Sequence, residues 1–257
     1  MVKTPSLYAR IREALNPGIR RSSKLTPEAW VVPRTDWRKL LSSDEMRQMA
    51  TICPPRPFQK GEAIYYQGDS AHSLYILLEG HVKLSLPSGS GERVLTIVGP
   101  DDIFGESFLT HSERRQSEAI CLSSKVIACP ISKEQFLQIA ERLPGVMLTF
   151  ATILAERNRA LEEELRLAIL PAEARLASVL LALAERFGEE VEPGIAHMKL
   201  ELKQEELGSM AGITRVFATQ TLSTWREQGL VEGTRGEYRI HLLELRQLVE
   251  RLEWDRP

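Results

Sequence analysis

The chain has 257 residues, a formal net charge of −2, and 43% hydrophobic and 26% charged residues. That length suffices for two domains with separate cores, and the composition is ordinary for a folded globular protein. No run of residues is long and apolar enough to span a bilayer, and the N-terminus lacks the apolar core of a signal peptide. We therefore expect a cytoplasmic protein without membrane contact.

The three cysteines are Cys53, Cys121 and Cys129, and they are far apart in the sequence. They form no C-x-x-C pair and show no metal-ligand spacing. We therefore expect a reducing compartment, no metal site and no iron–sulfur cluster.

Residues 1–43 are predicted to form a basic N-terminal arm. The segment holds nine Lys and Arg against three Asp and Glu, and four prolines interrupt it. Such an arm can lie along DNA phosphates, or it can be a mobile, solvated tail, and both readings stay open.

Residues 44–144 are predicted to form a domain of antiparallel strands, because short alternating apolar runs are separated by turn residues. No helical segment lies between these runs, which argues against a parallel α/β sheet. A turn is expected at 87–91. The expected strands cover residues 62–66, 74–78, 81–86, 93–98, 117–122 and 125–130.

A helical connection at 132–143 and one long helix over 145–169 are expected next. The long helix, the core of a dimerisation segment at 145–170, carries a near-heptad stripe of three- and four-residue steps. The stripe is Met147, Phe150, Leu154, Arg157, Leu161, Glu164 and Ala168. Because charged residues on such a seam suit a partner helix better than a closed core, we expect a parallel two-fold homodimer. Pro171 ends the helix and is the expected hinge.

Residues 171–257 are predicted to form a second domain, with a helix over 171–187, a loop at 188–194 and a helix-turn-helix over 203–226. A short helix is followed by Gly212, which suits a tight turn. Thr214 is a good N-cap for the second helix. The apolar stripe of that helix is Ala218, Leu222 and Trp225.

The opposite face of this second helix carries side chains that can reach base edges in a major groove. They are Arg215, Val216, Thr219, Gln220 and Ser223. A Gly-rich turn at 233–236 between two apolar runs adds the wing of a winged helix, with Arg235 and Arg239 near phosphate. The pattern predicts duplex DNA as the partner, and a helical hairpin inside an ordinary core is the alternative.

Charge gives this prediction no support, because residues 195–257 hold nine Lys and Arg against ten Asp and Glu. Acidic residues around the first helix, Glu201, Glu205 and Glu206, favour a second alternative. In that alternative the domain binds a protein or small molecule and no longer meets DNA. We do not expect an enzyme, since the chain has no P-loop, no nucleophile elbow and only scattered histidines.

Several motifs occur in a fixed order along the chain. They are KGEAIYYQGD and LYILLEGHVKL with Gly61, Gly68 and Gly80, then Phe104-Gly105-Glu106, the long helix, Arg175-Leu176-Ala177 and the helix-turn-helix. Over about residues 58–248 this order resembles the CRP/FNR superfamily of bacterial transcription regulators. Thr214-Arg215-Val216 and RLASVLLALAERFG are similar to its nitrogen-control (NtcA-like) branch.

The resemblance implies an α+β protein: an antiparallel β-roll of the cyclic-nucleotide-binding type, a dimerisation helix and a C-terminal winged helix-turn-helix. It implies a homodimer that reads a two-fold symmetric DNA site, with RNA polymerase as a further partner. Arg215 matches the family pattern and should read guanine, whereas Val216 replaces a frequent Glu and Gln220 a frequent Arg. Lys203 and Gln204 are placed for phosphates.

The resemblance also implies an effector pocket at Phe104, Gly105, Glu106, Ser107, Arg115, Gln116, Ser117 and Arg157. Cyclic-AMP binders of the family place an Arg-Ser pair ten residues beyond the Glu, and that Arg holds the cyclic phosphate. This chain has Gln116-Ser117 there, and Gln carries no charge. Arg115 is one residue away, and on a strand that shift points a side chain to the opposite face. Cyclic-nucleotide binding is therefore disfavoured.

The residues that other members of the family use to bind their effectors are not present either. The Cys cluster of oxygen sensors and the Cys and His of haem-binding relatives are absent. For 2-oxoglutarate binding the dimer helix should supply Arg and Glu, and the chain has Glu156 and Leu161 there. We therefore expect no cofactor and a pocket that its own side chains fill or that takes an unidentified ligand. Gating by a cyclic nucleotide or 2-oxoglutarate is the alternative.

Overall fold

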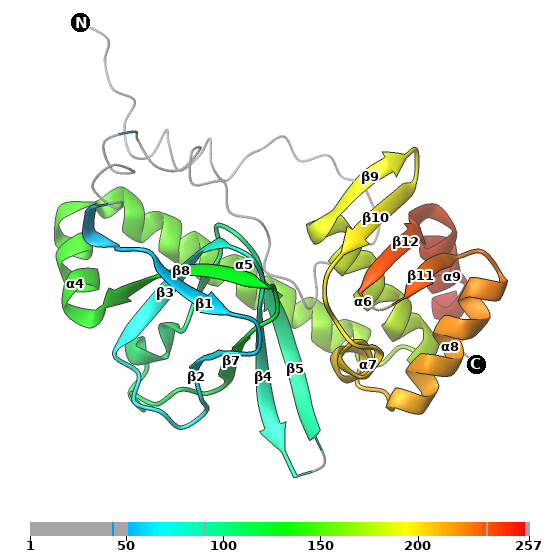
Figure 1. The fold of residues 1–257 in the computed structure, drawn as a ribbon, viewed down its shortest axis with the longest axis horizontal. Coiled ribbons are helices and arrows are strands. Elements are labelled where there is room, and N and C mark those ends of the chain that lie inside the picture. The colour runs from blue at the N-terminus through cyan, green and yellow to red at the C-terminus, as the bar shows by residue number, and fades with distance from the viewer. Residues whose placement is uncertain (1–42, 44–50, 90, 235, 255–257) are drawn as a thin grey trace, which may run out of the picture.

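The computed structural model describes residues 43, 51–89, 91–234 and 236–254. A β-rich domain lies on the left of Figure 1 and a smaller domain of helices and one sheet on the right, and the long helix α5 runs behind them. Apart from Ser43, the predicted basic arm lies outside the described residues, and so does Arg235.

Two four-stranded sheets, ordered β1-β8-β3-β6 and β2-β7-β4-β5, build the first domain. Every strand pairing in them is antiparallel, which confirms the predicted β-roll. The strands are β1 (Arg56–Gln59), β2 (Ala63–Tyr65), β3 (Ser73–Glu79), β4 (Val82–Ser88), β5 (Gly91–Val98), β6 (Ile103–Phe104), β7 (Glu118–Cys121) and β8 (Lys125–Ser132).

The strand prediction missed β6, and it was also wrong at two places that contain a proline. The turn expected at 87–91 is shorter, because β4 continues through Pro87, which lies opposite Glu92 of β5. The pairing of β4 with β7 on its other side ends at Ser85, so this proline interrupts no ladder there. Strand β1 was not predicted, and it lies at a sheet edge, where Pro57 is tolerated.

Helices α4 (Lys133–Arg142) and α5 (Pro144–Leu167) follow the β-roll, close to the predicted bounds, and a 3-10 turn, η1 (Glu106–Leu109), lies after β6. Ser132 and Gln135 form a capping box that begins α4. Among the described residues, no single helix is long and apolar enough to cross a membrane; α4 and α5 pass that test only as a pair bent by 116°.

The predicted dimer stripe of α5 divides into a buried and an exposed half. Met147 and Phe150 pack into the core of their own domain, and the Phe150 ring lies 5.1 Å from that of Phe136. Leu154 and Leu161 are 36% and 59% exposed. Ala168 caps the end of the helix. The exposed half alone is therefore available to a second copy.

The two charged residues of the stripe pair within their own chain. Arg157 Nη1 lies 2.6 Å from Glu106 Oε1, and Glu164 Oε1 lies 3.3 Å from Arg93 Nη2. The inference that these charges face a partner helix was therefore wrong. Helical periodicity shows which residues share a face of a helix, but it does not show which neighbour covers that face.

The second domain packs helices around one sheet, ordered β11-β12-β10-β9. Its elements are α6 (Ala172–Phe187), β9 (Gly188–Glu192), β10 (Ile195–Lys199), α7 (Gln204–Ala211), α8 (Arg215–Glu227), β11 (Val231–Thr234), β12 (Glu237–His241) and α9 (Leu242–Trp254). The loop expected at 188–194 instead contains β9. Backbone pairing with β10 at the sheet edge outweighs the low strand propensity of its acidic residues.

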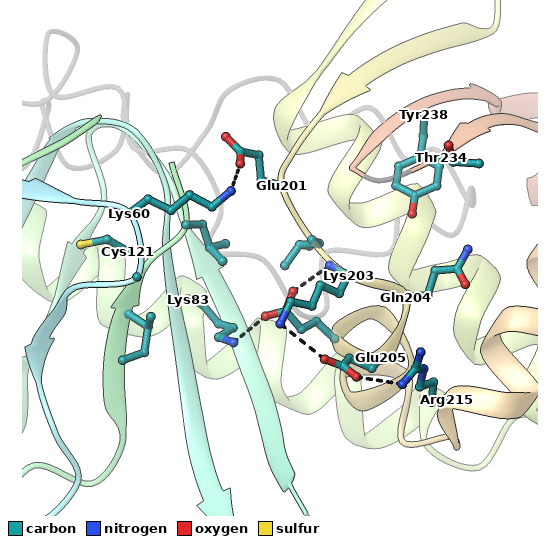
Figure 2. Close-up of a pocket in the computed structure, with 15 residues that line it drawn as sticks. Lys60, Lys83, Cys121, Glu201, Lys203, Gln204, Glu205, Arg215, Thr234 and Tyr238 are labelled. Carbon is teal, nitrogen blue, oxygen red and sulfur yellow. Dashed lines mark hydrogen bonds and ion pairs between the residues drawn. The ribbon is translucent and has the colours of Figure 1, made fainter. Parts of the chain in front are cut away.

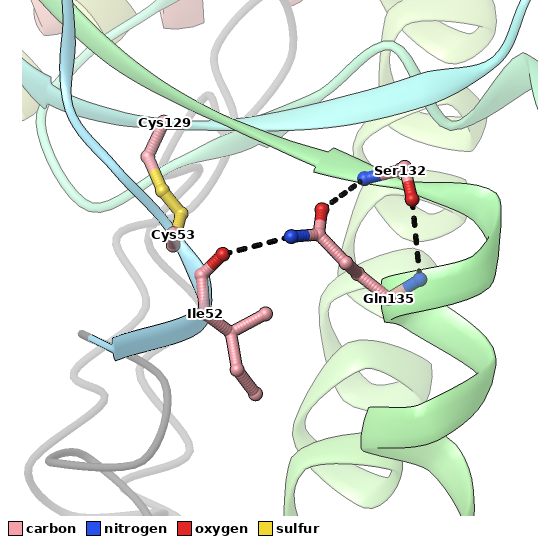
Figure 3. Close-up of a disulfide and its surroundings, with 5 residues drawn as sticks. All are labelled: Ile52, Cys53, Cys129, Ser132 and Gln135. Atoms are coloured by element: carbon pink, nitrogen blue, oxygen red, sulfur yellow. Dashed lines mark hydrogen bonds between the residues drawn. A yellow bond between two sulfur atoms is a disulfide. The ribbon is translucent and has the colours of Figure 1, made fainter.

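Cys53 and Cys129 form a disulfide (Figure 3), a pairing that their spacing in the sequence did not predict. Their Cα atoms are 5.4 Å apart, although 76 residues separate them. Strand β1 runs antiparallel to β8 with Arg56 opposite Ala128, so the chain before β1 passes beside Cys129. The Ile52 carbonyl accepts a hydrogen bond from Gln135 of α4, which holds the same segment.

Candidate nucleic-acid interface and effector pocket

Helix α8 presents the predicted reading face to solvent. The Thr214 hydroxyl accepts a hydrogen bond from the Phe217 amide at 3.2 Å, as expected of an N-cap. The stripe of Ala218, Leu222 and Trp225 is buried, which fixes the orientation of the helix. The residues of the opposite face are exposed: Arg215, Val216, Phe217, Thr219, Gln220 and Ser223.

The first turn of α7 lies beside this face. The Thr219 hydroxyl donates to Gln204 Oε1 at 3.0 Å and so joins the two helices. Glu205 lies 3.6 Å from Lys203 Nζ and 3.7 Å from Arg215 Nη1. A carboxylate therefore lies between two of the predicted DNA contacts, and because these pairs are exposed they contribute little stability against a competing phosphate.

The predicted wing is present as β11 and β12. At Gly236, with φ +86°, a Cβ atom would lie 2.6 Å from the Leu200 carbonyl oxygen, so the turn requires glycine. Arg239 pairs with Glu192 of β9 instead of extending from the turn. The structure therefore places this arginine on the face of the sheet, away from the position predicted for it.

Arg115 points into the predicted effector pocket, which corrects the expectation that it points away. The side chain is buried, its Nη2 donates to the Ser73 carbonyl at 2.7 Å, and its Nη1 donates to the Gly105 carbonyl. The guanidinium lies 4.2 Å from the centre of the Tyr65 ring. Strand β7 begins only at Glu118, so Arg115 lies in a loop where strand alternation does not apply.

The neighbours of Arg115 complete the pocket. Gly105 has φ +79°, and a Cβ atom there would lie 2.8 Å from Arg115 Nη1, so glycine admits the guanidinium. Phe104 is buried and stacks on Tyr75 at 5.2 Å. Arg157 holds Glu106, and among the described residues its Nε and Nη2 are buried without a hydrogen-bond partner.

The remaining predicted pocket residues lie at its edge. Gln116 is exposed, and its side chain donates to Ser112 Oγ and to the Arg114 carbonyl. The Ser107 carbonyl accepts from Thr110, and Ser117 bonds the hydroxyl of Tyr65. Burial raises the pKa of that phenol well above its usual range, with Glu106 adding to the effect. Among the described residues, no group of three or more His, Cys, Asp or Glu could hold a metal ion.

A buried ion pair joins the two domains at the end of α6. Arg186 Nη2 lies 2.8 Å from Asp102 Oδ1, and the exposed fraction of the Asp102 side chain is 0%. The Gly99 amide donates to the other carboxylate oxygen at 2.8 Å. Burial raises the pKa of Asp102 to about 6, although Arg186 and the Gly99 hydrogen bond act in the opposite direction.

We expect Asp102→Asn to change the pH dependence of stability. The folded protein keeps a proton on Asp102 up to about pH 6, whereas the unfolded chain releases it near pH 3.8. The contribution of this proton to the free energy of unfolding is therefore largest below pH 3.8. It decreases as the pH rises from 3.8 and is lost once the pH has passed 6. The free energy of unfolding of the wild type should fall relative to D102N by up to about 1.4 kcal/mol per pH unit in that window. Urea unfolding from pH 4 to 7 measures this, and parallel curves for the two proteins would contradict it.

Each of the two domains matches a known protein family. Residues 55–143 match the cyclic nucleotide-binding domain family, and residues 174–251 match the Crp-like helix-turn-helix domain family. The chain is 31% identical over 180 residues to a CRP-like cAMP-activated global transcriptional regulator of Mycobacterium tuberculosis, which covers 69% of this chain and 79% of that protein. It is 30% identical over 206 residues to the global nitrogen regulator of a Nostoc species, which covers 76% and 90% of the two chains. A solved transcriptional regulator of the CRP/FNR family from Thermus thermophilus has a similar fold, with TM-score 0.59, 26% identity, and coverage of 77% of this chain and 98% of that one.

Proposed function

This chain belongs to the CRP/FNR superfamily of transcription regulators, and we propose that it acts as a homodimer that reads a two-fold symmetric DNA site. The observation that carries the proposal is α8, a capped helix with one face locked into the core and the other exposed. We also propose RNA polymerase as a further partner, because the chain belongs to a family of transcription regulators.

Selection from a random pool of duplexes tests this function. A regulator of this kind enriches a palindrome whose half-sites are one helical turn apart, with affinity that falls steeply as salt rises. If the domain serves instead as a protein-binding module, no palindrome is enriched.

Within the reading face we assign the base contacts to Arg215, Val216 and Gln220. Arg215 suits the O6 and N7 atoms of guanine, and Gln220 suits adenine. Val216 is 65% exposed and offers methyl groups to thymine. Lys203 and Gln204 would contact phosphate. Arg239 leaves this set because its side chain extends toward Glu192 of β9 and not from the turn of the wing.

We expect Arg215→Ala to weaken binding to the selected site by about 1–3 kcal/mol and to relax the preference at one base pair. The side chain is 76% exposed and its ion pair to Glu205 is long, so its removal should leave the fold intact. Fluorescence anisotropy with the selected duplex and its single-base variants measures both effects. Arg251→Ala, an exposed arginine on α9, is the matched control and should change neither. Equal affinity of R215A and wild type would remove Arg215 from the base contacts.

For the effector, we propose that Arg115 occupies the space where relatives hold a cyclic phosphate, so cyclic AMP is not the physiological ligand. The two buried Arg157 nitrogens without a hydrogen-bond partner among the described residues favour an anionic ligand. A thermal-shift series with cyclic AMP, cyclic GMP, cyclic di-GMP and 2-oxoglutarate tests this. A large, saturable stabilisation by cyclic AMP overturns the proposal.

A further inference from the structure

Phe217 is an exposed aromatic side chain in the first turn of α8, and the base contacts proposed above do not include it. The side chain is 39% exposed. It belongs to none of the three apolar cores that the described residues form, although the next residue, Ala218, is fully buried in one of them. The packing of the domain core therefore does not require an aromatic residue at this position.

The N-cap of α8 fixes where Phe217 lies. The Phe217 amide donates to Thr214 Oγ1 at 3.2 Å, which places Phe217 within the first turn of the helix. Side chains of a helix lean toward its N-terminus. The N-terminal residues of a recognition helix are also the ones that contact base edges. The Phe217 ring therefore lies at the end of α8 that is expected to contact bases.

Phe217 and helix α7 lie on opposite flanks of the reading face of α8. The Thr219 hydroxyl donates to Gln204 of α7 at 3.0 Å. Figure 2 shows Arg215 beside Glu205 in the first turn of α7, and this pair is 3.7 Å apart. Phe217 is two residues from both Thr219 and Arg215, and two residues are about 200° of helical rotation. The ring therefore lies on the flank that α7 leaves free.

A major groove offers an apolar group to such a flank, the C5 methyl group of thymine. The groove is about 12 Å wide and a helix with its side chains is about 10–12 Å across, so both flanks of an inserted helix contact the groove. The thymine methyl group projects from the outer edge of its base, close to the backbone of its own strand. A phenyl ring has no hydrogen-bonding group, so this methyl group suits it better than a phosphate or a polar base edge does.

We propose that Phe217 is a further specificity-determining residue, whose ring packs against the C5 methyl group of one thymine in each half-site, on the side of the groove away from α7. The proposal rests on the DNA-binding function proposed above and adds a base to the site. Val216 and Phe217 are 65% and 39% exposed and lie about 100° apart around the helix, so they contact different bases. Each half-site therefore contains two thymines that the protein distinguishes by their methyl groups.

Replacement of single thymidines by deoxyuridine in the selected duplex tests this assignment, because it removes one methyl group and keeps every hydrogen bond of the base pair. Fluorescence anisotropy measures the affinity. At one thymine the wild type should lose about fourfold in affinity for each half-site changed. Phe217→Ala should bind the unmodified duplex more weakly and lose nothing further at that thymine, whereas Val216→Ala should still lose about fourfold there. Circular dichroism checks that F217A folds, and Phe217→Gln serves if it does not.

Tyr66→Ala is the matched control. Tyr66 is an aromatic residue of the β-roll that is 59% exposed, so its loss should change neither the affinity nor the response to deoxyuridine. If no deoxyuridine weakens binding by the wild type, or if F217A keeps the loss at every thymine, the assignment of Phe217 is overturned and the proposed function stands. If the wild type enriches no duplex, the proposed function fails and the assignment fails with it.

Discussion

Replacement of Leu161 by Glu on α5 is expected to turn the protein into a monomer and to weaken binding to its two-fold site by about 10²- to 10⁴-fold. Leu161 and Leu165 on α5 are 59% and 73% exposed, and Ile169, just after the helix, is 69% exposed, so the β-roll does not cover this side. A contiguous apolar stripe of this kind marks an interface. A carboxylate in this stripe, facing its own copy, opposes association. The two reading helices then bind separately, and the gain from linking them is lost.

Sedimentation equilibrium and binding to full and half sites measure this outcome. L161E should retain the affinity of a single half-site, since α8 is far along the chain from the change. Leu137→Glu on α4, at a leucine that is 54% exposed, is the control and should leave the dimer intact. A dimeric L161E with unchanged affinity would place the dimer contact elsewhere.

The DNA-binding helix could be predicted from the sequence because its signals are local. Thr214 caps the helix within one turn, and Ala218, Leu222 and Trp225 repeat at helical spacing and are all buried. Each signal depends on neighbours within a few residues, so no knowledge of the rest of the fold is required. The reading face is then simply the other side of the same helix.

The effector pocket could not be predicted in the same way, because its contacts are set by loops and by distant pairs. Arg115 enters the pocket from a loop that precedes β7, and strand alternation gave the wrong direction for it. Arg157 meets Glu106 across 51 residues. Periodicity placed Arg157 on the stripe of α5, and only the family resemblance placed it in one pocket with Glu106.

The buried ion pair between Lys83 of β4 and Glu206 of α7 was missed for a related reason. Glu206 was read as a charge that opposes DNA binding, since only its own helix could be considered. In the structure Lys83 neutralises it across 123 residues, and its second oxygen caps α7. A buried carboxylate on a short helix therefore indicates a partner domain, and not a repulsion from DNA.

Reduction of the Cys53–Cys129 disulfide is expected to lower the free energy of unfolding by about 4 kcal/mol. The bond closes a loop in which 76 residues separate the cysteines, and the stabilisation comes mainly from restricting the unfolded chain. It also ties the segment before β1 to β8, beside the core formed with α4 and α5. Urea unfolding with and without dithiothreitol measures the difference.

The double variant Cys53→Ala with Cys129→Ala should be as unstable as the reduced protein and should no longer respond to dithiothreitol. Cys121→Ala is the matched control, because this thiol is free and burial raises its pKa to about 12, which keeps it unreactive. C121A should therefore keep the full response to the reductant. Three free thiols in the purified, non-reduced protein, counted by mass spectrometry after alkylation, would show instead that the two sulfur atoms only pack together. The stability would then come from the apolar contacts of that core alone.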